Sequence, residues 1–479
     1  MDAENPTDRG EGPAKKGVTG TDLIHYGATW NPAAKLDEGP ESVAVLVCHG
    51  MGQQVRYETI SAVANAIRIE AVAEGGKVDP VEVHLSKEND AFLARAELNW
   101  QDTAQVVHCV HVYEAYWAPL TEGKVSYWDT LKFLFGAAWT CFRYTRGKFS
   151  RWMFGGRKNL SIGRWGPFLL LAVVVFLVAQ VSVGLYVSAV LVQMYGRIVA
   201  APLPLGTDAF HWHNWLAWAQ DATRHSVGSG SHAISSVLLL ALLVVGSYFF
   251  RHFVVQFVGD VAAYISPYKD SKFDEIRRAI QKVGLDVGKI VYGFGKDAPT
   301  DPKYKRIIVV GHSLGSVLAY DTLNALMNLD NVSSEDQKRD VVQRTRALIT
   351  FGSPLDKTAF IFRMQAKSDQ DWIREQMTDS VQPLIVSYPE FRPETLTWVN
   401  IWSPMDIISG SLDYYDDPAV PPDHPQHVQN MVDPQARTPL KAHVQYWSND
   451  LLRKKLYEFV SSETKTGQLS IHEAVSKAS

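Results

Sequence analysis

The stretch 306–316, which reads R-I-I-V-V-G-H-S-L-G-S, constrains the fold of this chain more than any other. The four apolar residues before its first glycine predict a buried strand, and the apolar residues of 316–327 recur at helical spacing. Strand, G-x-S-x-G turn and helix in this order form a nucleophile elbow, in which glycines beside the serine let strand and helix approach closely. We therefore expect Ser313 to be a nucleophile, with Gly311 and Gly315 as the elbow glycines. A serine that only caps the helix is the structural alternative.

The composition indicates a folded protein that works without disulfides. The 479 residues are 46% hydrophobic and 20% charged, which is ample for a core, and the net charge of −4 provides no attraction to nucleic acid. The cysteines, Cys48, Cys109 and Cys141, are few and odd in number and show neither disulfide nor zinc spacing, which favours a reducing compartment. The first 40 residues are polar and lack the apolar core of a secretory signal.

A second strand-and-turn unit lies near the N-terminus. The apolar run 43–48 leads into H-G-M-G, a glycine-rich turn of the kind in which hydrolases place an oxyanion-hole N–H. We expect Met51 or Gly52 to donate one such hydrogen bond and the Leu314 N–H to donate the other. An ordinary strand-to-helix turn is the alternative reading, and His49 is interpreted as a turn residue and not as the catalytic base.

The residues after this turn predict further regular elements. Residues 57–75 have a helical pattern, and strands are expected at 81–85, 91–98 and 106–117. Glu114 falls in the last of these strands, where a hydrogen-bonded or solvated carboxylate is a simpler interpretation than a functional acid.

The middle of the chain has the composition of a membrane segment. Residues 127–154 interleave aromatic and basic side chains, a pattern typical of a membrane interface, although a core-packed amphipathic helix has it too. The run 167–192 is uncharged and exceeds the roughly 20 apolar residues that cross a bilayer, and 234–250 is just long enough. We expect a two-helix transmembrane hairpin at 165–258. A very apolar buried hairpin is the alternative.

The distribution of positive charge predicts an orientation for this hairpin. Between Arg143 and Arg164 there are seven Lys or Arg residues and no acidic residue, whereas 197–232 contains only two Lys or Arg residues. Because the basic side stays in the cytosol, the expectation is an integral membrane protein with two spans, its catalytic domain and both termini facing the cytosol.

An activated serine needs a histidine and a carboxylate, which in this sheet topology follow it in the order acid, then histidine. Asp406 ends the stretch 397–406, which begins as an apolar strand, and is the favoured acid, with Asp356 as its rival. His443, just before the closing helix at 447–461, is the favoured base. His424 and His427 lie in the proline-rich loop 416–438, which could also act as a lid. Such a site requires neither metal nor cofactor.

Taken together, several short blocks resemble the α/β-hydrolase superfamily and, within it, the DDHD-type phospholipases. The blocks are H-G-M-G-Q at 49–53, G-H-S-L-G-S at 311–316, F-G-S-P-L at 351–355, P-M-D at 404–406 and H-V-Q-Y-W-S-N-D at 443–450. The resemblance implies a doubly wound, mostly parallel α/β sheet, interrupted here by the transmembrane hairpin. It also implies Ser313 as nucleophile, Asp406 as acid, His443 as base and Asp450 as a supporting aspartate.

The expected organisation has six segments. They are a tail at 1–40, the first part of the hydrolase core at 41–125, an aromatic-basic interfacial segment at 126–160, the hairpin at 165–258, the second part of the core at 259–462, and a tail at 463–479.

The resulting expectation is a membrane-anchored serine hydrolase that cleaves acyl esters of phospholipids or lysophospholipids, with membrane lipids as both substrate and anchor. Two alternatives remain open. One is an esterase or thioesterase that acts on a soluble acyl substrate. The other is a catalytically inactive hydrolase fold that serves as a membrane interaction module, although such a module needs neither a triad nor oxyanion donors.

Overall fold

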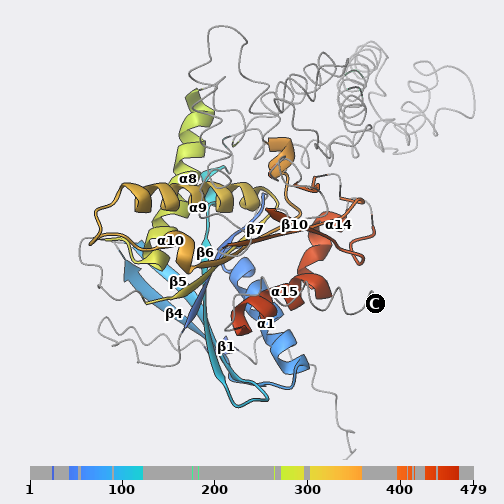
Figure 1. Ribbon diagram of the computed structural model, residues 1–479. Coiled ribbons are helices and arrows are strands. Elements are labelled where there is room, and N and C mark those ends of the chain that lie inside the picture. Colours follow the sequence, from blue (N-terminus) through green and yellow to red (C-terminus); the bar gives the residue numbers. More distant parts are fainter. Residues whose placement is uncertain are drawn as a thin grey trace, which may run out of the picture.

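The structure is a computed structural model. It describes residues 24–25, 42–51, 55–88, 91–121, 124, 175, 182, 264, 271–295, 303–358, 396–406, 408–412, 415, 427–438 and 441–462. These residues form one sheet with helices on both of its faces (Figure 1).

The sheet of the described residues has ten strands in the order β1-β4-β5-β6-β2-β7-β8-β9-β10, with β3 paired to β5. The strands are β1 (Ile24–His25), β2 (Val43–Cys48), β3 (Lys77–Val78), β4 (Val81–Glu88), β5 (Ala91–Gln101), β6 (Val107–Ala115), β7 (Arg306–His312), β8 (Thr345–Phe351), β9 (Thr397–Trp402) and β10 (Val428–Val432).

The half of the sheet from β6 to β10 is parallel throughout. Every residue of β2 is buried, as is every residue of β7 after Arg306, which is why these strands read as continuous apolar runs and do not alternate. Cys48 lies opposite Ala115 of β6 and Gly311 of β7. The segments that follow β2, β6 and β7 therefore leave the sheet at one common edge.

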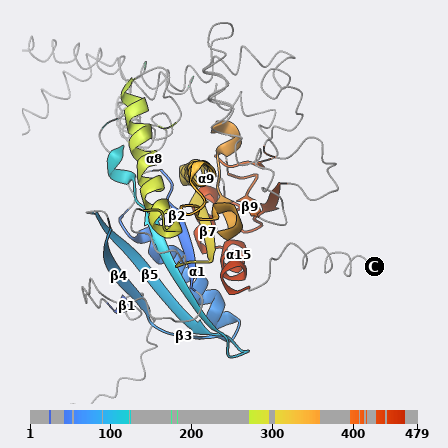
Figure 2. The same ribbon diagram turned by 60° about the vertical axis from the view of Figure 1, so that its left-hand side comes forward.

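The other half of the sheet is antiparallel from β4 through β5 to β6. Figure 2 shows β4 and β5 as long neighbouring strands at this side of the molecule. Buried and partly exposed side chains alternate along β5 from Leu93 to Trp100, because one face of this half is covered and the other is open.

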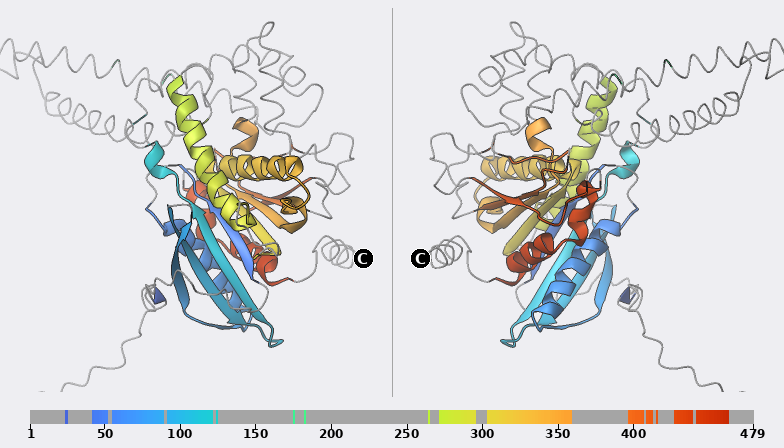
Figure 3. Two further views of the ribbon diagram at one scale, coloured as in Figure 1. Left: turned by 90° about the vertical axis from the view of Figure 1, so that its left-hand side faces the viewer. Right: turned by 90° about the vertical axis from the view of Figure 1, so that its right-hand side faces the viewer.

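Helices cover the two faces in pairs. The helices are α1 (Glu58–Ala73), η2 (Ala118–Leu120), α8 (Ser271–Tyr292), α9 (Leu314–Val332), α10 (Val341–Arg344), α14 (Ala442–Gln445), η6 (Tyr446–Ser448) and α15 (Asp450–Ser461). Helices α8 and α9 lie on one face and α1 and α15 on the other, as the two views of Figure 3 show. Each pair closes its own hydrophobic core against the sheet.

The expected fold class and localisation both need correction. The sheet is mixed, and none of the helices in the described part of the chain is long and apolar enough to cross a membrane. This contradicts an inserted transmembrane hairpin, and with it an integral membrane protein with two spans and cytosolic termini. The longest described helix, α8, has 22 residues but carries charged side chains along its length, so it lacks the apolar run that a span requires. The range 165–258 itself lies outside the described residues, apart from Val175 and Ser182.

Several other expectations concern residues that the structure does not describe. The interfacial segment 126–160 and the tail 463–479 lie wholly outside the described residues, and the tail 1–40 does so apart from Ile24 and His25. Within the described residues the local predictions agree closely with the structure. The helix predicted at 57–75 is α1, the strand at 106–117 is β6, and the closing helix is η6 with α15.

Candidate active site

Ser313 occupies the tight turn between β7 and α9 in a backbone conformation that non-glycine residues rarely adopt. Its φ is 54° and its ψ is −130°, and its side chain is almost completely buried. The Ser313 N–H donates to the carbonyl of Phe351 at 3.0 Å, and the Ser316 N–H donates to the carbonyl of Ser313 at 2.9 Å. The Ser316 hydroxyl donates to the carbonyl of Gly311 at 2.9 Å. These bonds hold the strained turn from both sides.

The two elbow glycines are required by close backbone packing. A Cβ atom on Gly311 would lie 2.5 Å from the Cα of Ser316, across the turn. A Cβ atom on Gly315 would overlap the carbonyl oxygens of Cys48 and His49, at the end of β2. The absence of side chains at these two positions therefore lets α9 begin directly against the loop that follows β2.

Three side chains that are distant in the sequence form a hydrogen-bonded chain. His443 Nε2 lies 2.7 Å from Ser313 Oγ, and His443 Nδ1 lies 2.9 Å from Asp406 Oδ2. With the carboxylate ionised, Nδ1–H donates to Asp406, and Nε2 accepts the proton of the Ser313 hydroxyl. The structure thus brings together the three residues predicted as nucleophile, base and acid.

The surroundings of Asp406 keep its carboxylate ionised. Burial alone would raise its pKa, but hydrogen bonds and the charge of His443 hold the pKa well below its usual range. The Ile408 N–H donates to Oδ1 at 2.9 Å, and the Tyr446 hydroxyl donates to Oδ2 at 3.0 Å. Tyr446 was not singled out from the sequence, because its role depends on the short helical turns that bring it back over the strand ends.

His312, the residue before the nucleophile, positions the base. Its Nε2–H donates to the carbonyl of His443 at 3.0 Å, and its ring stacks on Phe351 with centroids 4.9 Å apart. Burial and the neighbouring His443 lower the pKa of His312 to about 3, so its ring is neutral. The sequence pattern does not single out His312, since any residue can occupy this place in G-x-S-x-G.

Gly352 lies against the same histidine from another side. Its φ is +59°, and an added Cβ would approach the rings of His443 and Tyr446 at 3.2–3.3 Å. A side chain at this position would therefore combine backbone strain with pressure on the base.

The loop after β2 is held next to the nucleophile by His49. The Trp117 N–H donates to His49 Nε2 at 3.0 Å, and His49 Nδ1–H donates to the Gly50 carbonyl at 2.7 Å. Burial lowers the pKa of His49 to about 4. Because both ring nitrogens are occupied, His49 is placed as a turn residue. A Cβ on Gly50 would lie 2.9 Å from the Cβ of Ser313, so this backbone borders the site directly.

The predicted oxyanion donors are only partly described. Leu314 is the first residue of α9, where N–H groups have no partner within the helix. Met51 is buried just beyond Gly50, whereas Gly52 lies outside the described residues. The Leu314 N–H is thus at the start of the helix that follows the nucleophile, as an oxyanion donor must be.

The rival and supporting acids have other partners. Asp356 is buried after β8 and accepts the Lys357 N–H at 2.8 Å, while Lys357 Nζ donates to the carbonyls of Ile408 and Ser409. Lys357 therefore braces the loop that follows Asp406. Asp450 begins α15, is half exposed, and bonds to Gln435 and Arg453. Among the described contacts it is Asp406 that meets His443.

Two further predicted features lie near the same edge. Glu114 is buried at the end of β6, where burial raises its pKa, and it accepts the Tyr57 N–H at 3.1 Å beside the start of α1. It therefore anchors a helix terminus. In the proline-rich loop 416–438, which was considered as a lid, only 427–438 is described, so His424 lies outside the described residues.

The arrangement can move a proton from the serine hydroxyl to the imidazole while the carboxylate stabilises the resulting cation. Among the described residues, the side chains that could hold a metal ion lie elsewhere, on β5 and β6. The chain matches no protein-family model, no curated protein and no solved structure.

Proposed function

We propose that the chain is a serine hydrolase that cleaves carboxylic esters through an acyl-enzyme intermediate. The observation that carries this proposal is the pair of hydrogen bonds made by His443, 2.7 Å to Ser313 Oγ and 2.9 Å to Asp406 Oδ2. Both distances lie in the range required for proton transfer and for orientation of the ring.

In the first half-reaction, Ser313 Oγ attacks the carbonyl carbon of the ester while its proton passes to His443 Nε2. The tetrahedral oxyanion is stabilised by the Leu314 N–H and by a donor from the Met51–Gly52 backbone. The alcohol then leaves with the proton from His443. In the second half-reaction, His443 takes a proton from water, which attacks the acyl carbon. The bond from that carbon to Ser313 Oγ then breaks, His443 returns the proton to Ser313, and the acid is released.

A serine hydrolase of the α/β-hydrolase type accounts for the chain order of these residues. Ser313 follows β7, Asp406 follows β9, and His443 precedes the closing helix α15, which is the order nucleophile, acid, base. The strained backbone at Ser313 and the close approach of Gly315 to the end of β2 support the same proposal.

For the substrate we propose the acyl ester of a phospholipid or lysophospholipid. The support comes from the sequence: the blocks that resemble DDHD-type phospholipases, and the interleaved aromatic and basic residues of 127–154, which suit an anionic lipid surface.

A fluorophosphonate probe tests the hydrolase proposal, because it reacts only with an activated serine. The wild type should be labelled once per chain, on the peptide that contains Ser313, and Ser313→Ala should lose the label. Ser333→Ala, at the end of α9, is the matched control and should be labelled like the wild type. Absence of labelling in the folded wild type would overturn the proposal.

Two ester substrates then test the substrate class. A lipid enzyme should hydrolyse phospholipid or lysophospholipid in vesicles faster than a water-soluble short-chain ester at equal ester concentration. The reverse preference, with Ser313 still labelled, would leave the hydrolase proposal standing and replace lipids by soluble acyl esters or thioesters.

A further inference from the structure

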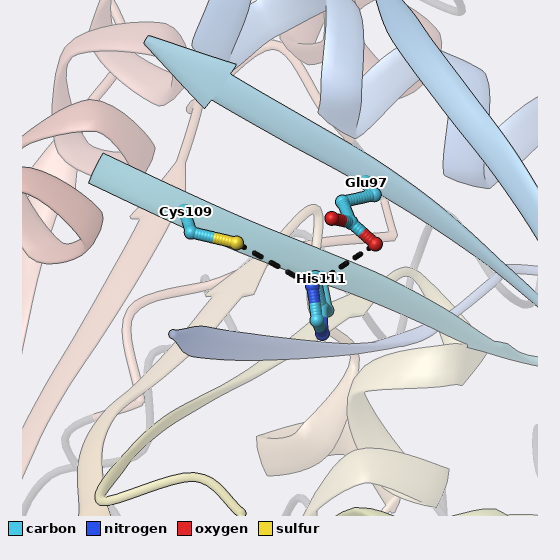
Figure 4. A group of neighbouring side chains, drawn as sticks. All are labelled: Glu97, Cys109 and His111. Carbon is cyan, nitrogen blue, oxygen red and sulfur yellow. Dashed lines mark hydrogen bonds and ion pairs between the residues drawn. The ribbon is translucent and has the colours of Figure 1, made fainter. Parts of the chain in front are cut away.

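A second group of reactive side chains lies in the antiparallel half of the sheet. Glu97 on β5 stands directly opposite His111 on β6, and Cys109 lies two residues before His111 on the same strand. Residues two apart on a strand share a face, so the three side chains project to one side of the sheet. Figure 4 shows the thiol and the carboxylate converging on the His111 ring from these two strands.

Two of the distances between these side chains match those of a metal site. Cys109 Sγ lies 3.4 Å from His111 Nε2, which lies 3.2 Å from Glu97 Oε2. All three ligand atoms fall within 4.8 Å of one another. In a tetrahedral zinc site, bond lengths of about 2.0–2.3 Å place neighbouring ligand atoms roughly 3.2–3.7 Å apart.

The fourth position of such a site faces the more exposed rim of the group. His84 on β4 lies there with its Nε2 3.2 Å from Glu82 Oε2 and 3.5 Å from Glu97 Oε2, so its ring bridges two carboxylates. The His84 side chain is 33% exposed, while those of Cys109 and His111 are buried. An ion could therefore enter the group from the side of His84.

The second nitrogen of His111 has the support that a metal ligand requires. His111 Nδ1 lies 2.6 Å from the Tyr304 hydroxyl, which lies 2.6 Å from the hydroxyl of Tyr113. When Nδ1–H donates to Tyr304, the lone pair of Nε2 faces the thiol and the carboxylate. A single Nε2–H could be directed at only one of these two groups, whereas a cation can bind both.

We propose that Glu97, Cys109 and His111 form a three-ligand site for a divalent ion of the zinc class, with the fourth position open to solvent. A thiolate, an imidazole and a carboxylate suit Zn²⁺ in ligand type. His111 is level with Ala44 and Ile307 in the sheet, six residues before Ser313, which places the site roughly 20 Å from the nucleophile along the strands. The ion would join β5 and β6, a structural role independent of ester hydrolysis.

Metal titration of the full-length protein, first freed of metal with a chelator, tests this site. Zn²⁺ should bind once per chain by isothermal titration calorimetry. Co²⁺ at the same site should give a tetrahedral spectrum with a thiolate-to-cobalt charge-transfer band, because Cys109 supplies a sulfur ligand. A wild-type Co²⁺ spectrum without that band would overturn the proposal, and this measurement needs no variant.

Variants assign the ligands. Cys109→Ser and His111→Ala should lower the Zn²⁺ affinity at least 100-fold, and Tyr304→Phe about 10-fold as a supporting partner. His108→Ala is the matched control, since His108 is on the same strand, faces the other side and bonds to Asp102. Circular dichroism checks that each variant is folded. Affinity unchanged in both ligand variants, or equally reduced by His108→Ala, would contradict the site.

Discussion

The triad and the Glu97–Cys109–His111 group both place a histidine beside a carboxylate, partly buried in the triad and buried in the other group, yet they differ in what the ring can do. His443 uses its two nitrogens for two different partners, Ser313 on one side and Asp406 on the other. His111 has a thiol and a carboxylate at the same nitrogen. The first arrangement is a chain along which a proton moves, and the second converges on one point, as ligands do around an ion.

The two groups also lie on different kinds of support. Ser313 and Asp406 follow the ends of parallel strands, and His443 lies in the short helix α14, so turns and a short helix position them. The ligand group lies within the paired strands β5 and β6, where the strand register sets the spacing. Loops suit a catalytic site that a substrate must enter, whereas paired strands hold side chains in a rigid arrangement.

The largest expected contrast comes from removing the two histidines. His443→Ala should lower kcat for an ester substrate by about 10⁴-fold or more, because the general base is lost. His111→Ala should leave kcat within about threefold, since its ring lies far from the nucleophile. Steady-state kinetics on the folded variants measure both. A comparable loss in the two variants would break the distinction between the regions.

The acid is the next test. Asp406→Asn should lower kcat by about 10³–10⁴-fold, because a neutral amide neither stabilises the imidazolium nor selects its tautomer. Asp356→Asn, the matched change at the rival carboxylate, should cost less than about 10-fold. If Asp356→Asn has the greater effect, the acid of the triad is wrongly assigned.

Tyr446→Phe tests how much the hydrogen bond from Tyr446 to Asp406 contributes to catalysis. Loss of its hydrogen bond to an ionised carboxylate costs about 1.5–3 kcal/mol, and part of this cost raises the activation free energy of the reaction. We expect kcat to fall about 10-fold with KM unchanged. A change confined to KM would assign Tyr446 to substrate binding.

The smallest effect concerns acid stability at the triad edge. The folded-state pKa of His312 is about 3, below the ordinary value of about 6.5, so between these values the unfolded chain binds the extra proton. The free energy of unfolding therefore falls as pH drops from about 6.5 toward 3. His312→Gln should make that slope shallower by up to about 1.4 kcal/mol per pH unit, measured by urea unfolding. An unchanged slope would show that His312 is not the buried neutral group described here.

The triad edge could largely be anticipated from the sequence because its signals are local. The elbow needs only one strand, one turn and one helix, and Asp406 and His443 stand next to recognisable elements. Tyr446 and His312 escaped notice, since each acts through a contact that only the folded chain creates.

The Glu97–Cys109–His111 group in the antiparallel half of the sheet was harder to predict from the sequence. The sequence indicates the strands of 81–117, but Glu97 meets His111 through a cross-strand register that no local pattern encodes. The expected membrane hairpin was wrong: uncharged apolar runs and the bias of positive charge predicted two spans, and the described helices include none.

The central claim, that Ser313 is an activated nucleophile, is tested most directly by pre-steady-state hydrolysis of a chromogenic acyl ester. We predict a burst of released alcohol equal to about one per chain, followed by slower turnover, with an acyl group on the Ser313 peptide by mass spectrometry of the quenched reaction. Ser313→Ala should show no burst. A burst that persists in Ser313→Ala, or an acyl group on another residue, would contradict the account.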